Sequence, residues 1–198
     1  MIELPLPWAH RAISVVRFDD HEAVDALLSP AELEESAAFR LAKRREEWRL
    51  SRAAGKLLAM RVGVCDDPRR ITLPRPVFAV DGHPTPWFVS LSHSRPYAGA
   101  ICGQEPVGID VQVVRTFSES AAHLFLSREE EEQMKRCTIA DRILHFWCAK
   151  EAAWKQRSSE FVTMKQLPLS LEREEDGGLL FNAVETTRIE DLVIAVTR

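Results

Sequence analysis

The sequence predicts an α+β protein, a pseudo-twofold duplication of two similar halves in which helices pack on a mainly antiparallel sheet. Three observations lead to this prediction: the order of helical and strand-like segments, a repeat at an offset of 98 residues, and a globular composition. Apolar residues make up 45% of the 198 residues, enough to bury a core without disulfide bonds. We expect the halves to span residues 1–105 and 106–198.

The first half begins with alternating apolar residues and continues with helical periodicity. Ser29 opens one helix as a capping box with Glu32, and Pro30 takes the first helical position. Short apolar runs separated by Pro and Gly predict strands after the helices. The expected segments are a strand near residues 12–18, helices near 20–28, 30–42 and 43–62, and strands near 71–73, 76–81, 87–93 and 97–103.

The second half follows the same plan. A second capping box starts at Ser127, with Glu130 three residues later. The expected segments are a strand near residues 106–114, helices near 118–126, 128–136 and 139–157, and strands near 168–172, 178–184 and 191–197.

An offset of 98 residues brings several similar residues together, although chance similarity between amphipathic helices is an alternative explanation. In this register Asp110 aligns with Ala12, and Glu151 aligns with Ala53. Two acids that the fold of the other copy does not need point to chemistry in the second copy. The matched residues are Val15–Arg17 with Val113–Arg115, Leu28 and Ser29 with Leu126 and Ser127, Trp48 with Phe146, Arg52 with Lys150, and Ala54 with Ala152.

Composition disfavours several classes of protein. A net charge of −4 disfavours a nucleic-acid-binding protein, and no apolar run is long enough to span a membrane. The N-terminal residues lack the pattern of a signal peptide. Four cysteines without CxxC spacing indicate buried apolar residues in a reducing compartment. We therefore expect a cytoplasmic protein that binds neither nucleic acid nor a membrane.

Three fragments carry candidate functional residues. In the strand 106–113, Asp110 and Gln112 project from one face, and Gly108 leaves room for a ligand or a neighbouring backbone. An ordinary half-exposed strand is the alternative.

Basic residues between Lys43 and Arg61 suggest a discrete anionic ligand, or simply a solvated helix face.

The second fragment is the helix around Glu151. A surface i,i+4 ion pair between Glu151 and Lys155 is one interpretation. Burial beside tryptophans is the other, and it obliges the charges to find a metal or a phosphate. Helical spacing places on one side the residues Trp147, Lys150, Glu151, Trp154 and Lys155.

The third fragment is Ser90–Arg95, with His93 near the end of a strand. A single histidine serves structure as readily as chemistry. No Gly-x-Ser-x-Gly elbow is present, which disfavours a serine hydrolase.

Together these fragments resemble the signature of the Sfp-type 4′-phosphopantetheinyl transferases. The motifs are Ser-His-Ser at 92–94, Gly-Ile-Asp at 108–110, and Trp-x-x-Lys-Glu-Ala-x-x-Lys at 147–155. The basic helix and the turn Asp81–Pro84, which is similar to the family's Gly-Lys-Pro turn, extend the resemblance to residues 39–157. Two residues differ from the usual family pattern: Gln112 replaces a glutamate, and His83 replaces a lysine.

The resemblance implies the 4′-phosphopantetheinyl transferase fold, with coenzyme A bound between the halves and a divalent cation, Mg²⁺ or alternatively Mn²⁺. The reaction moves 4′-phosphopantetheine from coenzyme A to a serine of an acyl or peptidyl carrier protein and releases 3′,5′-ADP. The implied roles are metal ligation by Asp110, Glu151 and Gln112; catalysis by Glu151, Lys155 and Asp110; and coenzyme A binding by His93, Ser92, Arg45, Arg49, Arg52, His83, Lys150 and Lys155.

Three further expectations concern the activity, the oligomeric state and the carrier. The Gln112 substitution leaves a degenerate coenzyme A-binding or partner-binding module as an alternative to the enzyme. Because one chain supplies both repeats, we expect a monomer rather than the trimer of the short carrier synthases. The residues identify neither the carrier pathway nor whether acyl-coenzyme A is accepted.

Overall fold

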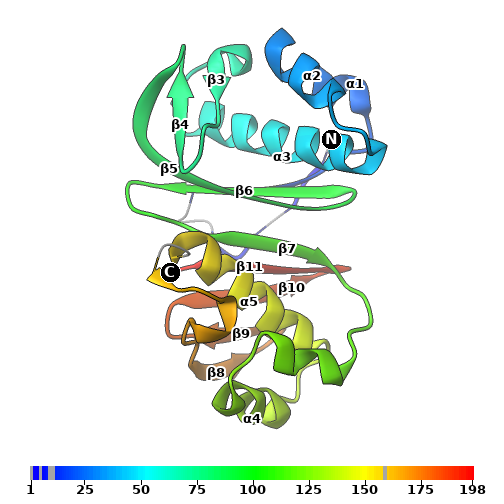
Figure 1. Ribbon diagram of the computed structural model, residues 1–198, viewed down its shortest axis with the longest axis vertical. Helices are drawn as coiled ribbons and strands as arrows, with labels where there is room; N and C mark the ends of the chain where they lie inside the picture. Colours follow the sequence, from blue (N-terminus) through cyan, green and yellow to red (C-terminus); the bar gives the residue numbers. More distant parts are fainter. Residues whose placement is uncertain (1, 5, 9–11, 158–159) are drawn as a thin grey trace. The chain divides into compact units, whose positions relative to one another are not determined.

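The computed structural model describes residues 2–4, 6–8, 12–157 and 160–198. The chain forms two compact units, Met1–Val107 and Gly108–Arg198, each with its own antiparallel sheet and its own apolar core (Figure 1). The boundary falls close to the predicted one. Helices beside antiparallel strands in both units confirm the predicted α+β class.

In the first unit, one long helix packs on a six-stranded sheet. Apolar residues of the helix, such as Leu50 and Leu58, meet Val89 and Leu91 of the sheet in a buried cluster. The helices are α1 (His21–Asp25), α2 (Pro30–Ala37) and α3 (Ala42–Arg61). The strands, in sheet order, are β1 (Ile2–Glu3), β2 (Ile13–Arg17), β6 (Tyr97–Gly103), β5 (His83–Ser94), β4 (Val77–Val80) and β3 (Ile71–Thr72). A 3₁₀ turn, η1 (Pro68–Arg70), precedes β3.

In the second unit, α5 packs on a five-stranded sheet. Phe146 of this helix meets Phe181 edge to face, with ring centroids 4.9 Å apart. The helical segments are η2 (Glu119–Leu124), α4 (Arg128–Arg136), α5 (Arg142–Arg157) and η4 (Met164–Gln166). The strands, in sheet order, are β7 (Ile109–Val113), β11 (Leu192–Thr197), β10 (Val184–Ile189), β9 (Gly178–Phe181) and β8 (Leu171–Glu175).

Apart from β1, the chain follows the same path through both sheets. In each unit a first strand leads into helices, then four strands meander until the last one pairs with the first. Both predicted capping boxes are present, at Ser29 with Glu32 and at Ser127 with Glu130. A common strand order and a common helix start agree with the plan that the sequence predicts.

Three parts of the sequence prediction need correction. The last part of the chain has four strands rather than three, because β10 lies almost entirely between the predicted strands near 178–184 and 191–197. Only Asn182 and Ala183 join β9 to β10, without the Gly or Pro that usually marks a turn. Strand β1 was also missed, since two residues carry no periodicity. The helix predicted near 118–126 is the 3₁₀ segment η2.

Two expectations about the chain as a whole can be compared with the structure. Within the described residues, no helix combines the length and the apolar character needed to cross a bilayer. All four cysteines are free, and Cys102, Cys137 and Cys148 are buried. This confirms that these three serve as small apolar residues.

Candidate active site

The buried acid of the site is Asp110 on β7. Its residue is 2% exposed, so the alternative of an ordinary half-exposed strand is wrong. Lys155 Nζ lies 2.8 Å from Asp110 Oδ1 and donates a second hydrogen bond, also 2.8 Å, to the carbonyl oxygen of Ile109. A buried carboxylate needs such a partner, because desolvation disfavours its charge. The pair therefore holds the ammonium of α5 against the start of the second sheet.

Gly108 permits this contact between α5 and β7. A Cβ at this position would lie 1.9 Å from the carbonyl oxygen of Ala152 and 3.3 Å from the amide nitrogen of Gln156. No side chain fits at such distances. Of the two uses expected for this glycine, the structure shows the approach of a neighbouring backbone.

Glu151 lies on the same side of α5 as Lys155 and close to Asp110. Burial raises the pKa of the Glu151 carboxyl, and the negative charge of Asp110 raises it further, whereas Lys155 acts in the opposite direction. A carboxylate with a raised pKa accepts a proton more readily than a solvated one. The expected surface ion pair of Glu151 with Lys155 is replaced by the bond from Lys155 to Asp110.

Gln112 completes the polar group at Asp110. Its Nε2 donates to Asp110 Oδ2 at 3.0 Å, so each oxygen of the aspartate accepts a hydrogen bond. The structure thus unites four predicted residues: Asp110, Gln112, Glu151 and Lys155. Gln112 here acts as a donor to the aspartate, and its metal-binding role stays a prediction.

Lys150 does not join this group. Its side chain is 0% exposed, and its Nζ lies 2.7 Å from Glu130 Oε1 and within hydrogen-bond distance of the carbonyl oxygen of Leu167. Glu130 in turn accepts from the backbone N–H groups of Ser127 and Leu169. The expectation that Lys150 shares one functional side with Glu151 is therefore wrong, because one buried carboxylate holds it elsewhere.

The first unit contains the same buried pair. Lys56 is 0% exposed, and its Nζ contacts Glu32, the capping-box glutamate of α2. This unit has no acid at the place of Glu151, since Leu57 follows Lys56 as Glu151 follows Lys150. Because the first unit has this buried pair but no acidic site, we infer that the pair stabilises the fold of each unit.

A second contact is also common to both units. Lys155 donates to the carbonyl oxygen of Ile109, and Arg61 donates to the carbonyl oxygen of Ile13. In the second unit the residue that follows this carbonyl, Asp110, pairs with the lysine. In the first unit Arg61 meets Glu3 of β1 instead of an acid on the strand itself.

These contacts change the alignment between the units. The capping boxes of the two units are 98 residues apart in sequence. Matching residues of the first strands and of the long helices are separated by fewer residues. The acids still occur in the second unit alone, so the argument for chemistry there is retained. The corrected pairs are Asp110 with Ser14 and Glu151 with Leu57, in place of Ala12 and Ala53.

Asp110 and Glu151 suit a hard divalent cation that takes few of its ligands from the protein. Asp110 raises the pKa of Glu151, which shows two negative groups close enough to repel each other. A cation between such groups relieves the repulsion. Mg²⁺ is commonly held by one or two carboxylates together with substrate phosphates, so Asp110 and Glu151 fit it. Among the described residues, no group of three or more acidic, histidine or cysteine side chains is arranged so that it could hold a metal ion by itself.

The predicted coenzyme A residues of the first unit lie on several elements. His93 is exposed near the end of β5, whereas Ser92 before it is buried on the opposite face. His83 is exposed and starts β5 directly after the turn residues Asp81 and Gly82, whose φ values are 50° and 80°. Such a two-residue turn with positive φ is typical of a tight hairpin.

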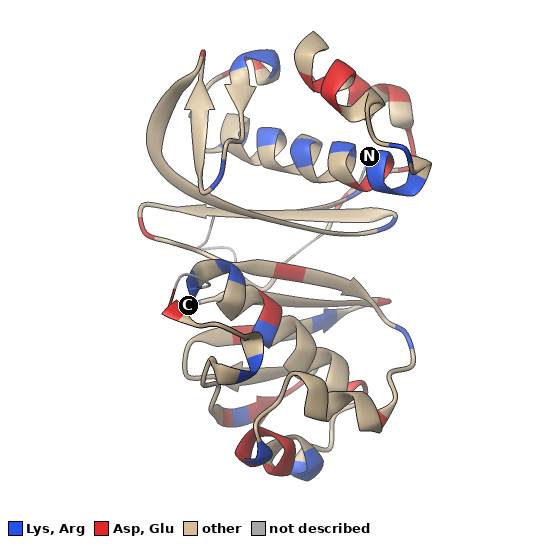
Figure 2. Ribbon diagram, viewed as in Figure 1, with Lys and Arg blue, Asp and Glu red and all other residues tan. Residues whose placement is uncertain are grey.

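Lys and Arg residues are spaced along α3 (Figure 2). The three arginines of this helix that were predicted to bind coenzyme A differ in their surroundings. Arg49 is already engaged, with Nη1 3.0 Å from both carboxylate oxygens of Asp25 and Nε 2.8 Å from Ser36 Oγ. Arg52 lies over the ring of Trp48 at 4.5 Å. Arg45 is partly exposed.

A basic pocket of the first unit was missed. Its volume is about 440 Å³, with Phe18 and Leu50 on the apolar side. Glu46 lies in it, 2.9 Å from Arg95 and 3.6 Å from His21. The basic stretch of the sequence contained Lys43 of this pocket, but nothing in the sequence linked it to residues from other elements.

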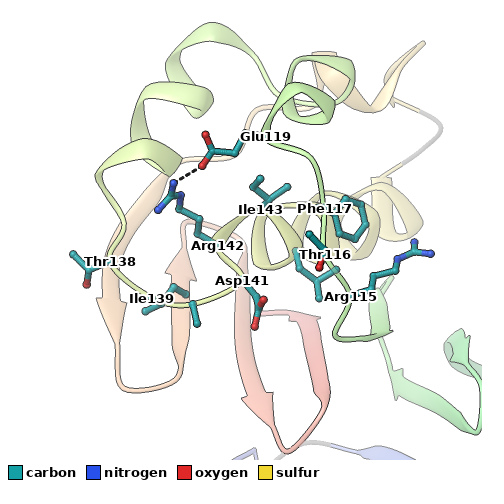
Figure 3. A pocket seen from close by; sticks show the side chains of 11 residues that line it. Arg115, Thr116, Phe117, Glu119, Thr138, Ile139, Asp141, Arg142 and Ile143 are labelled. Atoms are coloured by element: carbon teal, nitrogen blue, oxygen red, sulfur yellow. Dashed lines mark hydrogen bonds and ion pairs between the residues drawn. The ribbon is translucent and has the colours of Figure 1, made fainter.

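A pocket of the second unit was also missed (Figure 3). It has about the same volume, 440 Å³, and it lies between the segment after β7 and the start of α5. Arg142 and Glu119 form an ion pair of 2.5 Å at its wall. The apolar residues Phe117 and Ile139 also line this pocket. They belong to no recognisable motif, so the sequence did not indicate the pocket.

A buried histidine makes the stability of the second unit depend on pH. His145 Nδ1 lies 2.8 Å from Thr186 Oγ1, and burial, helped by the charge of Arg188, lowers the pKa of His145 to about 4. An unfolded histidine titrates near 6.5, so below that pH the unfolded chain binds a proton that the folded chain does not. The contribution of His145 to the free energy of unfolding is therefore fully present above about pH 6.5 and is lost as the pH falls below it. At pH 5 we expect a loss of about 2 kcal/mol from this group.

Urea denaturation of wild type and His145→Gln at pH 8 and pH 5 measures this effect. The variant is expected to lose less stability between the two pH values, because it carries no titrating imidazole. An equal loss in both proteins would contradict the assignment.

The comparisons with known proteins agree with this geometry. Residues 106–196, just under half of the chain, match the family model of the 4′-phosphopantetheinyl transferase superfamily. No curated protein matches the chain. The match covers β7 with Asp110 and α5 with Glu151 and Lys155, all of which the structure brings together. Residues 106–196 of this chain therefore form a domain of the 4′-phosphopantetheinyl transferase superfamily.

Proposed function

We propose that this protein transfers 4′-phosphopantetheine from coenzyme A to the serine of an acyl or peptidyl carrier protein and releases 3′,5′-ADP. One observation carries the proposal: the partly buried Glu151 beside the Asp110–Lys155 pair, within a domain of the transferase superfamily. This superfamily implies coenzyme A and carrier proteins as partners.

The side chains of the second unit divide the work between them. The serine oxygen forms a bond to the β-phosphorus of coenzyme A as the phosphoanhydride bond breaks, and the hydroxyl proton passes to Glu151. The raised pKa of Glu151 suits it for this role as a base. Lys155, fixed by Asp110 and by the carbonyl of Ile109, presents a positive charge to the transferring phosphate.

Asp110 and Glu151 are the residues that would hold Mg²⁺, with Gln112 beside them. When bound, the cation neutralises charge on the pyrophosphate and on the leaving 3′,5′-ADP. Asp110 thus has two tasks, ligation of the cation and orientation of Lys155.

On the first unit we propose that His93, His83, Arg45 and Arg52 contact coenzyme A. His93 and His83 are exposed, and within the described residues no ion pair joins Arg45 or Arg52 to an acid, which supports this choice because phosphates attract cationic donors. Arg49 and Lys150 are omitted, because carboxylates already engage both of them.

We further propose that the chain is the two-repeat form of the family and arose by duplication. Three features support it: the common strand order, the capping boxes, and the buried lysine–glutamate pair in each unit. A chain that contains both repeats is expected to act as a monomer. We propose the cytoplasm as its location, because its cysteines are free.

Intact-mass spectrometry of an apo carrier protein tests the proposed reaction. Incubation with this protein, coenzyme A and Mg²⁺ is expected to add about 340 Da, the mass of the phosphopantetheine group. Fatty-acid, polyketide and peptidyl carriers are each offered. If coenzyme A binds but no carrier gains mass, the protein is a binding module without transfer activity, and the proposal is wrong.

Gln112→Glu is expected to lower the Mg²⁺ concentration that gives half-maximal transfer. The substitution adds a negative charge next to Asp110, and a hard cation binds more tightly to additional carboxylates. The measurement is a Mg²⁺ titration of the initial rate in both proteins. An unchanged requirement would place Gln112 outside the metal site.

A further inference from the structure

The pocket at the start of α5 contains a buried donor that the protein does not satisfy. This pocket, of about 440 Å³, lies between the segment that follows β7 and the first residues of α5 (Figure 3). Within the described parts of the chain, Arg142 Nε is the only buried side-chain nitrogen or oxygen without a hydrogen-bond partner in the protein. Buried polar groups of folded proteins are nearly always paired, so this exception indicates an acceptor that another molecule supplies.

The unpaired Nε shares one edge of the guanidinium group with Nη2. The N–H groups along this edge are parallel, and together they match the two oxygens of a carboxylate. Glu119 occupies only half of the edge of Arg142, because its Oε1 lies 2.5 Å from Nη2 while Nε has no acceptor. The dashed line in Figure 3 marks this single contact.

Two other arginines of the protein show how a carboxylate fills this edge completely. In Arg157, Nε and Nη2 both donate to the carboxylate of Glu160, at distances between 2.8 and 3.1 Å. In Arg70, Nε and Nη2 both donate to Asp81. The pair of Arg142 with Glu119 is therefore incomplete and leaves room for a better acceptor.

Glu119 is held weakly at its half of the edge. It lies on the 3₁₀ segment η2, and its side chain is 70% exposed. An ion pair with such an exposed partner contributes little to stability, so a ligand can replace Glu119 at small cost. A carboxylate that takes both N–H groups of Arg142 has to make this replacement at Nη2.

The other charges around the pocket favour an anion. The second acid of its wall, Asp141, is paired with Arg188 at 2.5 Å. Arg115 also lines the pocket, with its guanidinium carbon 4.9 Å from the ring centroid of Phe117. Among the residues that the structure describes, no ion pair joins Arg115 to an acid, so it adds a positive charge that no carboxylate balances.

Apolar side chains supply the rest of a small-molecule site. Ile143 and Leu144 of α5 are buried at the pocket, and Phe117 and Ile139 are partly exposed there. Small-molecule sites commonly have volumes of about 300–1,000 Å³, with apolar walls and a few polar groups that orient the ligand. The pocket has this size and this combination of groups.

We propose that this pocket binds a small organic carboxylate with an apolar chain or ring. The carboxylate accepts hydrogen bonds from Nε and Nη2 of Arg142 and displaces Glu119, while the apolar part of the ligand lies against Phe117 and Ile139. Arg142 precedes Glu151 by nine residues, about 13 Å along an α-helix. The site is thus separate from the acids of the second unit, and it does not depend on the proposed transfer reaction.

NMR titration of the labelled full chain with hexanoate and with phenylacetate tests the site. Hexanamide and phenylacetamide are the neutral probes of matching size, and we expect each to bind about tenfold more weakly than its carboxylate, because charged hydrogen bonds are lost. The indole signal of Trp147 should shift on binding, since its ring lies 6.4 Å from that of Phe117. Arg142→Lys keeps the positive charge but removes the paired N–H groups, so it should weaken both carboxylates by about tenfold.

Glu119→Gln is expected to have the opposite effect. The amide removes the negative charge that competes for Arg142, so both carboxylates should bind about two- to fivefold more tightly, in line with the small contribution of an exposed ion pair. The exposed pair of Arg173 with Glu175 on β8 provides the matched controls. Arg173→Lys and Glu175→Gln should bind the probes as wild type does.

Three results would overturn the site. Carboxylates that bind no more tightly than their amides, or that do not bind, would show that the pocket does not select an anion. Equal affinity of wild type and a folded Arg142→Lys protein would remove Arg142 from the site. Weaker binding by Glu119→Gln would show that Glu119 supports the ligand and does not compete with it. Circular dichroism establishes folding, and if Arg142→Lys does not fold, the amide probes and Glu119→Gln still decide.

Discussion

Glu151→Gln is expected to slow carrier modification by about 10²–10⁴-fold, the range that a general base contributes. The substitution keeps the size of the side chain and removes the oxygen that accepts the serine proton. The measurement is the initial rate of carrier mass gain for wild type and Glu151→Gln at equal Mg²⁺ and coenzyme A concentrations.

Glu172→Gln is the matched control, since it removes an equal charge from an exposed position on β8 of the same unit. We expect wild-type rates from it. Coenzyme A binding by Glu151→Gln should be retained, which separates loss of chemistry from loss of substrate. A Glu151→Gln rate close to that of wild type would show that another group takes the proton.

Lys150→Met is expected to destabilise the protein by about 3–5 kcal/mol, the usual cost of removing one partner from a buried ion pair. Glu130 would retain its two backbone donors but lose the ammonium that balances its charge. Urea denaturation of both proteins gives the difference. The double variant Lys150→Met with Glu130→Gln should recover part of the loss, because no unpaired charge is then buried.

Lys135→Met on α4 is the control for loss of a positive charge, because this lysine is exposed and forms a surface pair. Its free energy of unfolding should change by less than about 0.5 kcal/mol. A folded Lys150→Met protein with normal stability and weakened coenzyme A binding would return Lys150 to the ligand site. The buried pair would then have no structural role.

The fold was predictable where short patterns determine it. Two capping boxes and strong helical periodicity placed α3, α4 and α5 close to their observed positions and gave the start of α2, which ends at Ala37 and not near residue 42. Strand β10 was missed, because its turn lacks Gly and Pro and because β-propensity depends on the neighbouring strands. Contacts between distant segments, such as β1 with β2, leave no periodic signal in the sequence.

The sequence predicted the acidic residues of the candidate site better than the contacts of its lysines. Asp110 and Glu151 stood out because the first half of the sequence has no acid at the positions aligned with them. The partners of the lysines did not, since Lys155 bonds to Asp110 across 45 positions and Lys150 lies turned toward Glu130. Helical spacing gives the side of a helix only coarsely, and neighbouring residues such as Lys150 and Glu151 diverge in direction.

The contact at Gly108 has a consequence for how this protein tolerates change over evolutionary time. Asp110 and Glu151 are carried by two backbones that touch at Gly108 and Ala152, without a side chain between them. Ala152 also belongs to the buried apolar cluster around Phe146 and Phe181. Any residue larger than glycine at position 108 would push α5 away from β7 and separate the two acids, so selection on the site acts on a position that has no side chain of its own.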